Sequence, residues 1–280
     1  MSELQGRIIR TVDVAVDELE RYANALEDIH QDRLDAVVLR QVFPDDLRRT
    51  ILGRLEADGA LPWRRPNRTG PEVDIRVLGA AATPTFETPG GPAVDAYFED
   101  AARYTEIYDR LLAGAADPIE AMLGRIAGGR PVERLVAADG RRFAGCTIRS
   151  LPEGQQIIVH HDGRHYLLPV YRDAAGGLDT STSLSCVIML QAPEAGGELV
   201  IHGLTDDDPV PRLPNYLPDG EVIKARYHSH KVKMTAGDVL VFSAGRFYHH
   251  VAAVIGAQPR ITLGAFLTLD REHRKVIYWN

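Results

Sequence analysis

Residues 147–161, TIRSLPEGQQIIVHH, begin a series of short apolar runs that alternate with turn residues up to residue 269. The two runs in this stretch, Thr147–Leu151 and Gln156–His161, are separated by Pro152-Glu153-Gly154, which is typical of a turn. Further strands are expected at Tyr166–Val170, Ser183–Gln191, Glu198–Ile201, Ala225–Val232, Asp238–Phe242, His249–Val254 and Arg260–Leu269. Many short strands with Gly, Pro and Asp turns indicate an antiparallel sandwich or barrel of jelly-roll size.

Residues 1–140 have a different, mostly helical pattern. In Val14–Ile29 and Ala93–Leu112, apolar residues recur at three- and four-residue steps, as on one face of a helix. Pro44-Asp45-Asp46 and Asp117-Pro118 have the composition of helix starts, and Gly128-Gly129 is expected to end the second of these helices. A strand is expected at Ala36–Leu39, and an irregular connection at residues 64–92.

These patterns predict a single domain over residues 1–280, mainly β with α. Residues 141–280 are expected to form a double-stranded β-helix, or jelly roll. N-terminal and inserted helices from residues 1–140 are expected to pack on one side of it, as support or as a lid.

The composition is that of an ordinary globular protein, with a formal charge of -7. This charge argues against nucleic acid as a partner, because phosphate binding needs a concentrated basic surface. Cys146 and Cys186 lie in apolar, strand-like surroundings and are expected to be buried thiols. No signal peptide or membrane span is visible, so a reducing, cytoplasmic setting without membrane contact is expected.

Eight of the ten histidines lie between residues 160 and 250, within the strand-rich half of the chain. His160 and Asp162 occupy alternate positions after an apolar strand, so both side chains can face the same side while His161 faces away. One imidazole and one carboxylate need a second histidine to complete a facial triad, which holds Fe(II) and leaves positions open. An H-x-D pair alone is a weak signal.

A second strand, around His249, supplies the third ligand, and Arg260 follows eleven residues later. An arginine buried in a β core needs an anion, and its guanidinium fits a carboxylate in a bidentate way. Thr262 shares the strand side of Arg260 and could donate to the same carboxylate. Arg149 is a weaker candidate for binding the cosubstrate or an anionic substrate, and a surface charge is the alternative.

These residues resemble the iron(II)/2-oxoglutarate dioxygenases: H-x-D at residues 160–162, H-x-V-x-x-V at residues 249–254, and a following arginine. Four stretches also resemble a subgroup of that family: Gln41–Pro44, Pro193–Val200, Gly245–Arg260 and Ile277–Trp279. The subgroup contains the freestanding small-molecule halogenases of indole-alkaloid pathways and their hydroxylase relatives, including the N-acyl amino acid hydroxylases. The similarity runs from about residue 34 to the end, and it is thin between residues 60 and 140.

The resemblance implies an enzyme that uses Fe(II), 2-oxoglutarate and dioxygen, with His160, Asp162 and His249 as metal ligands. It also implies a freestanding small-molecule substrate, an amino acid derivative or natural-product intermediate, and release of succinate and CO2. In the halogenases of the subgroup, glycine replaces the acid of H-x-D and chloride takes the vacant position. Asp162 therefore departs from the halogenase pattern and favours hydroxylation.

Several alternatives stay open. His250 competes with His249 as the third ligand, although the H-x-V-x-x-V register favours His249. His228 and His230 could form a same-side pair, but a solvent-facing edge strand is the simpler interpretation. His161 and His165 flank the motif without an assigned role, and the long loop 203–221 could cover the site. A halogenase, a cupin-like metal-binding protein and a non-catalytic relative are the competing functions.

Overall fold

The computed structural model describes residues 4–65, 74–82, 91–112, 114–115, 117–163 and 165–280. It is a mixed α/β structure whose strands form three sheets. The large sheet has nine strands, with the order β1-β2-β11-β7-β14-β15-β4 and with β5 and then β3 branching from β14. Its strands are β1 (Thr11–Val14), β2 (Ala36–Leu39), β3 (Arg76–Leu78), β4 (Val132–Arg134), β5 (Thr147–Leu151), β7 (Leu184–Gln191), β11 (Val239–Phe242), β14 (Arg260–Leu269) and β15 (Val276–Trp279).

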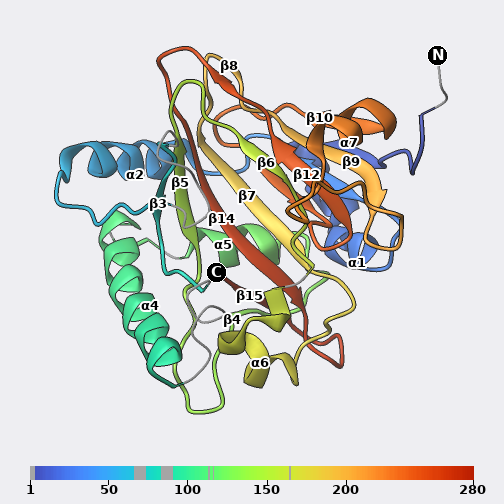
Figure 1. Ribbon diagram of the computed structural model, residues 1–280. Helices are drawn as coiled ribbons and strands as arrows, with labels where there is room; N and C mark the ends of the chain where they lie inside the picture. Colours follow the sequence, from blue (N-terminus) through green and yellow to red (C-terminus); the bar gives the residue numbers. More distant parts are fainter. Residues whose placement is uncertain (1–3, 66–73, 83–90, 113, 116, 164) are drawn as a thin grey trace.

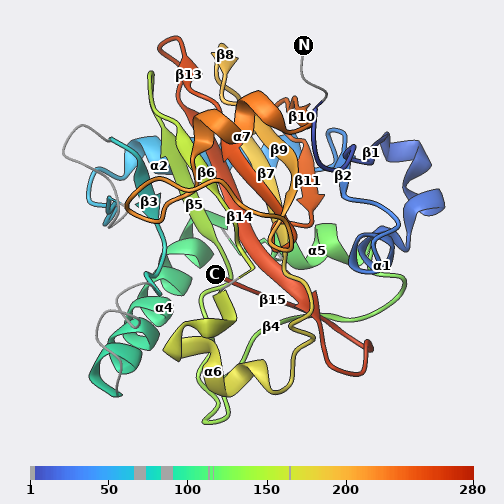
Figure 2. The same cartoon turned by 45° about the vertical axis from the view of Figure 1, so that its right-hand side comes forward.

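A four-stranded sheet with the order β10-β9-β12-β6 forms the second layer (Figures 1 and 2). Its strands are β6 (Ile157–His160), β9 (Leu199–Thr205), β10 (Ser229–Val232) and β12 (Phe247–Val251). All pairings in this small sheet are antiparallel. Two short strands, β8 (Ala195–Gly196) and β13 (Val254–Ile255), pair in an antiparallel fashion as a third sheet.

The large sheet is buried on both faces, and β2 shows why its sequence is uniformly apolar. Successive side chains of a strand point to opposite faces. Val37 and Leu39 belong to the core beneath the helices, whereas Ala36 and Val38 belong to the core shared with the small sheet. A strand that packs on both sides must be apolar throughout.

Several helices cover the outer face of the large sheet (Figures 1 and 2). They include α1 (Ala25–His30), α2 (Asp45–Ala57), α4 (Gly91–Leu112) and α5 (Pro118–Gly124). Asp117 caps α5 by accepting a hydrogen bond from the Ile119 N–H, as its position before Pro118 predicts. No helix in the described part of the chain is long and apolar enough to cross a membrane.

Most of the predicted strands are present, but one prediction was wrong and two were wrong in part. Residues 166–170 form no strand, because Pro169 lacks the N–H of a ladder and instead starts α6 (Pro169–Ala175) after η2 (His165–Leu167). Residues 225 and 226 end α7 (Gly220–Arg226), which Asp219 caps, so β10 begins only at Ser229. The run 249–254 divides between β12 and β13.

The first half of the chain also contains more strand than its pattern suggested. The expected helix Val14–Ile29 is divided into η1 (Val16–Tyr22) and α1, and Val14 belongs to β1, which pairs with β2. Helix α5 ends at Gly124, before Gly128-Gly129. The predicted irregular segment 64–92 lies partly outside the described residues, and its described part includes β3.

Candidate metal centre

His160 and His249 lie side by side on adjacent strands of the small sheet. They are paired residues of the antiparallel strands β6 and β12, and their ring centroids are 4.2 Å apart. The side chains of such pairs lie on the same face of the sheet. His249 is 3% exposed, and the ring of Phe242 packs edge-on against it at 4.9 Å.

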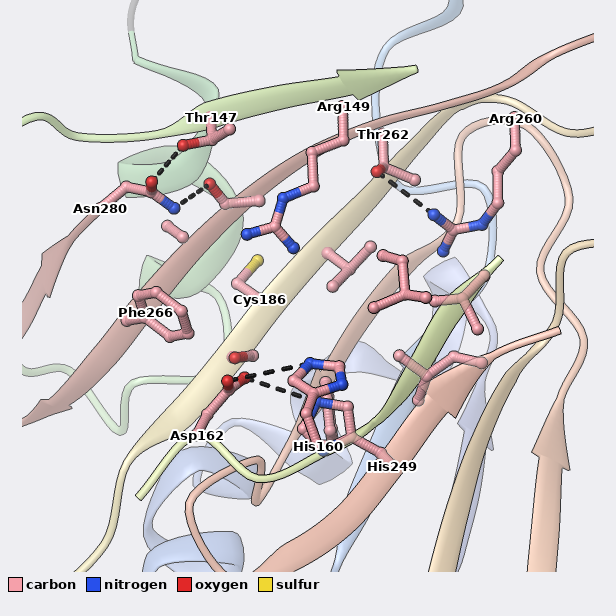
Figure 3. Close-up of a pocket in the computed structure, with 18 residues that line it drawn as sticks. Thr147, Arg149, His160, Asp162, Cys186, His249, Arg260, Thr262, Phe266 and Asn280 are labelled. Atoms are coloured by element: carbon pink, nitrogen blue, oxygen red, sulfur yellow. Dashed lines mark hydrogen bonds and ion pairs between the residues drawn. The ribbon is translucent and has the colours of Figure 1, made fainter. Parts of the chain in front are cut away.

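Asp162 completes a three-residue cluster (Figure 3). Its Oδ2 lies 3.4 Å from His249 Nε2, and its Oδ1 lies 3.9 Å from His160 Nε2. The Asp162 N–H donates to the Ala244 carbonyl, which holds the backbone beyond the end of β6 against the loop before β12. One ligand atom from each residue lies within 4.8 Å of the others, as three ligands on one side of an ion require.

Both imidazoles are held in the form that a metal binds. His160 Nδ1 lies 2.8 Å from the Ile158 carbonyl, and His249 Nδ1 lies 3.0 Å from the Phe247 carbonyl. A carbonyl only accepts, so each Nδ1 carries the proton and each Nε2 presents a lone pair toward Asp162. Burial lowers the pKa of His160 to about 4, which keeps that imidazole neutral.

Arg260, at the start of β14, brings a buried positive charge into the same cavity. It is 2% exposed, and burial lowers its pKa to about 10, with nearby Arg149 adding to the effect. Its Nη1 donates to the Thr262 hydroxyl at 3.4 Å. Among the residues that the structure describes, its buried Nε has no hydrogen-bond partner. A buried guanidinium with an unused donor is suited to an anionic ligand.

Arg149 is a second cation of this cavity. It lies on β5 directly opposite Thr262 of β14, and its side chain points into the space above the histidines (Figure 3). Burial lowers its pKa, whereas the charge of Asp162 opposes that shift. Arg149 is half-buried and lines the cavity, which favours a role in the site over a purely surface charge.

The cavity lies between the two sheets and brings all six predicted site residues together. Its empty volume is about 580 Å³, counting the open solvent at its mouth. Sequence reasoning missed several lining residues: Thr147, Cys186, Phe242, Phe266 and Asn280. Asn280 hydrogen-bonds to the Thr147 hydroxyl and to the Gly264 carbonyl. No local sequence motif indicates these residues, because the pairing of strands brings them together from distant parts of the chain.

The remaining histidines lie elsewhere. His161 faces away and stacks on Tyr248 at 5.0 Å. His250 points to the opposite face from His249, where its Nδ1 lies 2.9 Å from His202 Nε2, so it does not join the cluster. His230 is on the edge strand β10, as expected. No described residue of the loop 203–221 lines the cavity, and both cysteines are buried and free.

The family model of the carrier-protein-independent halogenase WelO5 matches residues 8–280. The chain therefore belongs to this family, which confirms the resemblance carried by the H-x-D and H-x-V-x-x-V motifs. It is thus an enzyme of the iron/2-oxoglutarate oxygenase and halogenase group. No curated protein sequence matches the chain significantly.

Two solved structures share the fold. An N-substituted L-amino acid dioxygenase from Burkholderia ambifaria AMMD has a TM-score of 0.55 at 15% identity, covering 92% of this chain and 91% of the other. The structure described as its complex with alpha-KG has a TM-score of 0.52 at 17% identity, with the same coverage. Identities this low support the architecture alone.

Proposed function

We propose that the chain is an iron(II)/2-oxoglutarate-dependent oxygenase that hydroxylates an unactivated C–H bond of a freestanding small molecule. One observation carries the proposal: the Nε2 lone pairs of His160 and His249 converge with Asp162 in a cavity that also holds the buried Arg260. A cupin-like binding protein would need no such arginine beside its metal, and a non-catalytic relative would be expected to lack a ligand.

The donor set fits the implied cofactors. Two imidazoles and a carboxylate form the facial triad typical of non-haem iron oxygenases. Bound iron and 2-oxoglutarate would activate dioxygen, which is the oxidant in the overall reaction R–H + O2 + 2-oxoglutarate → R–OH + succinate + CO2.

The chain's own residues provide binding and placement. His160, Asp162 and His249 would hold the metal from one side, and Arg260 with Thr262 would bind the far carboxylate of 2-oxoglutarate. Phe242, packed against His249, helps to exclude water. We further infer that the two facing sheets are the halves of a double-stranded β-helix and that residues 1–280 form one oxygenase domain.

Anaerobic addition of Fe(II) and then 2-oxoglutarate tests the proposal. The chelate is expected to produce a visible charge-transfer band in the wild-type protein and none in His249→Ala. Absence of the band in folded wild-type protein would contradict the assignment.

Asp162 favours hydroxylation over halogenation. A carboxylate at this position takes up the coordination site that the halogenases leave for chloride. Family membership supports halogenation as the second candidate. Mass spectrometry of products formed in chloride buffer distinguishes the two, and a chlorinated product from the unmodified enzyme would overturn hydroxylation.

For the substrate, we propose a small amino acid derivative or natural-product intermediate that carries an anionic group. Arg149 adds a second, half-buried cation to the cavity of Arg260, and one dicarboxylate cosubstrate would already satisfy Arg260. The structural neighbour from Burkholderia ambifaria is named for N-substituted L-amino acids. Succinate release measured across a panel of carboxylated and neutral amino acid derivatives would identify the class, and a preference for neutral ones would contradict it.

A further inference from the structure

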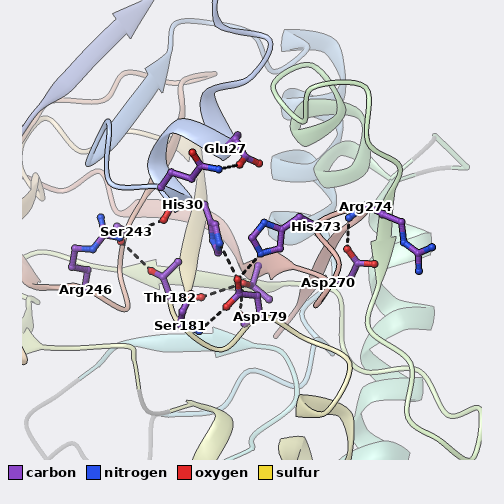
Figure 4. Close-up of polar contacts among 12 residues, drawn as sticks. Glu27, His30, Asp179, Ser181, Thr182, Ser243, Arg246, Asp270, His273 and Arg274 are labelled. Atoms are coloured by element: carbon purple, nitrogen blue, oxygen red, sulfur yellow. Dashed lines mark hydrogen bonds and ion pairs between the residues drawn. The ribbon is translucent and has the colours of Figure 1, made fainter.

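A second cluster of possible metal ligands lies outside the cavity. His30, Asp179 and His273 each offer one ligand atom, and these atoms lie within 4.8 Å of one another (Figure 4). The Nε2 atoms of both histidines point at the same carboxylate oxygen, Asp179 Oδ2, at 3.0 Å for His30 and 2.6 Å for His273. The two rings are perpendicular, with centroids 4.8 Å apart, so their nitrogens approach this oxygen from different directions.

The three side chains come from parts of the chain that are far apart in sequence. His30 ends α1, Asp179 lies between α6 and β7, and His273 lies in the turn between β14 and β15. The His273 backbone has φ of 56°, a left-handed conformation that is uncommon for residues other than glycine. That conformation directs its ring toward Asp179.

Hydrogen bonds hold the carboxylate and the backbone of Asp179 in place. Asp179 Oδ1 accepts the Ser181 N–H at 2.9 Å, which leaves Oδ2 toward the histidines. The Asp179 N–H donates to the Leu269 carbonyl, and the Thr268 hydroxyl donates to the Asp179 carbonyl. A ligand carboxylate that accepts a hydrogen bond from an outer donor, as Asp179 does from the Ser181 N–H, is typical of metal sites.

The charge of Asp179 is not balanced by a fixed cation. Among the described residues, the ion-pair partners of Asp179 are the two histidines alone, with no arginine or lysine within 4.0 Å. Two fully buried carboxylates of this protein, Asp35 and Asp238, each face an arginine, whereas the partly buried Asp179 faces the histidines. His30 Nδ1 is buried and has no hydrogen-bond partner among the described residues, so its polar contacts are directed to Asp179.

We propose that His30, Asp179 and His273 form a second divalent-metal site, separate from the oxygenase centre and suited to zinc. Two imidazoles and a carboxylate are ligands that zinc accepts, with water completing the tetrahedron. The half-exposed His273 leaves a side of the site open for that water. Around a tetrahedral zinc with bonds of about 2.1 Å, ligand atoms lie roughly 3.4 Å apart. Binding of zinc would therefore move the Nε2 atoms of both histidines away from Asp179 Oδ2 by less than about 1 Å.

A metal at this site would have a structural role. It would join the end of α1 to the loop before β7 and to the β14–β15 turn. These segments are distant in the sequence, so the site would not exist in the unfolded chain, and the free energy of metal binding would add to the stability of the folded one.

Zinc stoichiometry tests the proposal. The full chain is stripped with chelator, dialysed against Zn²⁺ alone, and analysed by atomic absorption. We expect two equivalents in the wild type and one in His273→Asn, in which asparagine tolerates the left-handed backbone but cannot reach as a ligand. His228→Ala, which removes a histidine outside both clusters, is the matched control and should retain two.

A second measurement separates this site from the oxygenase centre. In the His160→Ala background, Zn²⁺ at a hundredfold excess over its Kd is expected to raise the Tm by about 5 °C, and His273→Asn should abolish the rise. Asp179→Asn, which keeps the acceptor for Ser181, replaces His273→Asn if the latter does not fold. Equal zinc content in wild type and His273→Asn, or no Tm shift in His160→Ala, would overturn the proposal and leave a hydrogen-bonded trio.

Discussion

The surroundings of Arg260 indicate the kind of ligand that the proposed site would bind. Its guanidinium is buried, and its polar contact within the cavity is a long hydrogen bond to Thr262. An arginine in such surroundings costs folding free energy unless an anion binds to it. The cost is therefore expected to be recovered when the cosubstrate carboxylate binds.

Replacement of Arg260 by lysine should weaken 2-oxoglutarate binding without unfolding the protein. Lysine keeps the charge but loses the bidentate fork, worth about 1.5–3 kcal/mol for a charged hydrogen bond. The Kd for 2-oxoglutarate is thus expected to rise by roughly 10- to 150-fold, as measured by anaerobic titration of the charge-transfer band. Arg125→Lys, at an exposed position, is the matched control, and an unchanged Kd in Arg260→Lys would refute the assigned role.

Asp162→Gly tests the residue that distinguishes the two chemistries. Removal of the carboxylate opens one coordination position next to His249, so hydroxylated product should fall by at least about 100-fold, equivalent to roughly 2.7 kcal/mol. If halide can enter, chlorinated product appears in chloride buffer. Liquid chromatography with mass spectrometry measures both products. Hydroxylation at the wild-type rate would mean that Asp162 is not a ligand.

At the scale of elements, the outer face of the small sheet holds a buried imidazole pair. His202 of β9 and His250 of β12 are hydrogen-bonded at 2.9 Å and stacked with 13° between their planes. Burial lowers the pKa of His202 to about 3 and that of His250 to about 4, from 6.5. Both therefore stay neutral in the folded protein while the unfolded chain takes up protons below pH 6.5.

The protein should consequently lose stability as the pH falls below 6.5. Each histidine can cost up to about 1.4 kcal/mol per pH unit between its unfolded and folded pKa values, and stability is fully present above pH 6.5. Urea unfolding of the metal-free protein between pH 7 and 5 measures the slope. His202→Gln should flatten it relative to His228→Ala, and parallel slopes would contradict the prediction.

Two glycines make a matched test of close packing. Gly203 of β9 lies against the N-terminal segment, where a Cβ would meet the Arg7 carbonyl at 2.0 Å, whereas a Cβ at Gly53 in α2 would meet nothing within 4 Å. Gly203→Ala is expected to lower the free energy of unfolding by about 1–3 kcal/mol, and Gly53→Ala to raise it by about 0.5–1 kcal/mol. Urea midpoints compare the two, and equal effects would contradict this packing.

At the scale of the whole molecule, the metal centre links the two sheets. The proposed metal ligands come from β6, from β12 and from Asp162, two residues beyond the end of β6, whereas Arg260 and Thr262 come from β14 of the large sheet. A cosubstrate that spans the metal and Arg260 contacts both layers. Binding should therefore stabilise the entire fold, not only the loops of the site.

Anaerobic Fe(II) with 2-oxoglutarate, at a hundredfold excess over the Kd, is expected to raise the Tm by about 5 °C. Scanning calorimetry measures the shift. Asp162→Asn should lose most of it because the metal is bound less tightly. A shift of the same size in that variant would indicate that the ligands bind elsewhere.

Local patterns in the sequence were sufficient to predict β14, β5, β7 and the helix start at Asp117. Alternating or continuous apolar runs with proline or glycine at their ends depend only on neighbouring residues. The same logic predicted that His160 and Asp162 share a face. The apolar residues of Tyr166–Val170 suggested a strand. Pro169 lacks the N–H that a strand ladder needs, and it begins a helix instead.

Tertiary structure alone decided which distant residues meet. The register of β12 on β6 places His249 opposite His160, and the pairing of β14 with β5 places Arg149 beside Thr262. Nothing near Asn280, His30 or His273 in the sequence indicates their neighbours, because those contacts follow from sheet order and helix packing. The residue types and spacings of the metal triad could thus be read from the chain, whereas its geometry, the place of Arg149 in the cavity and the second cluster required the packed sheets.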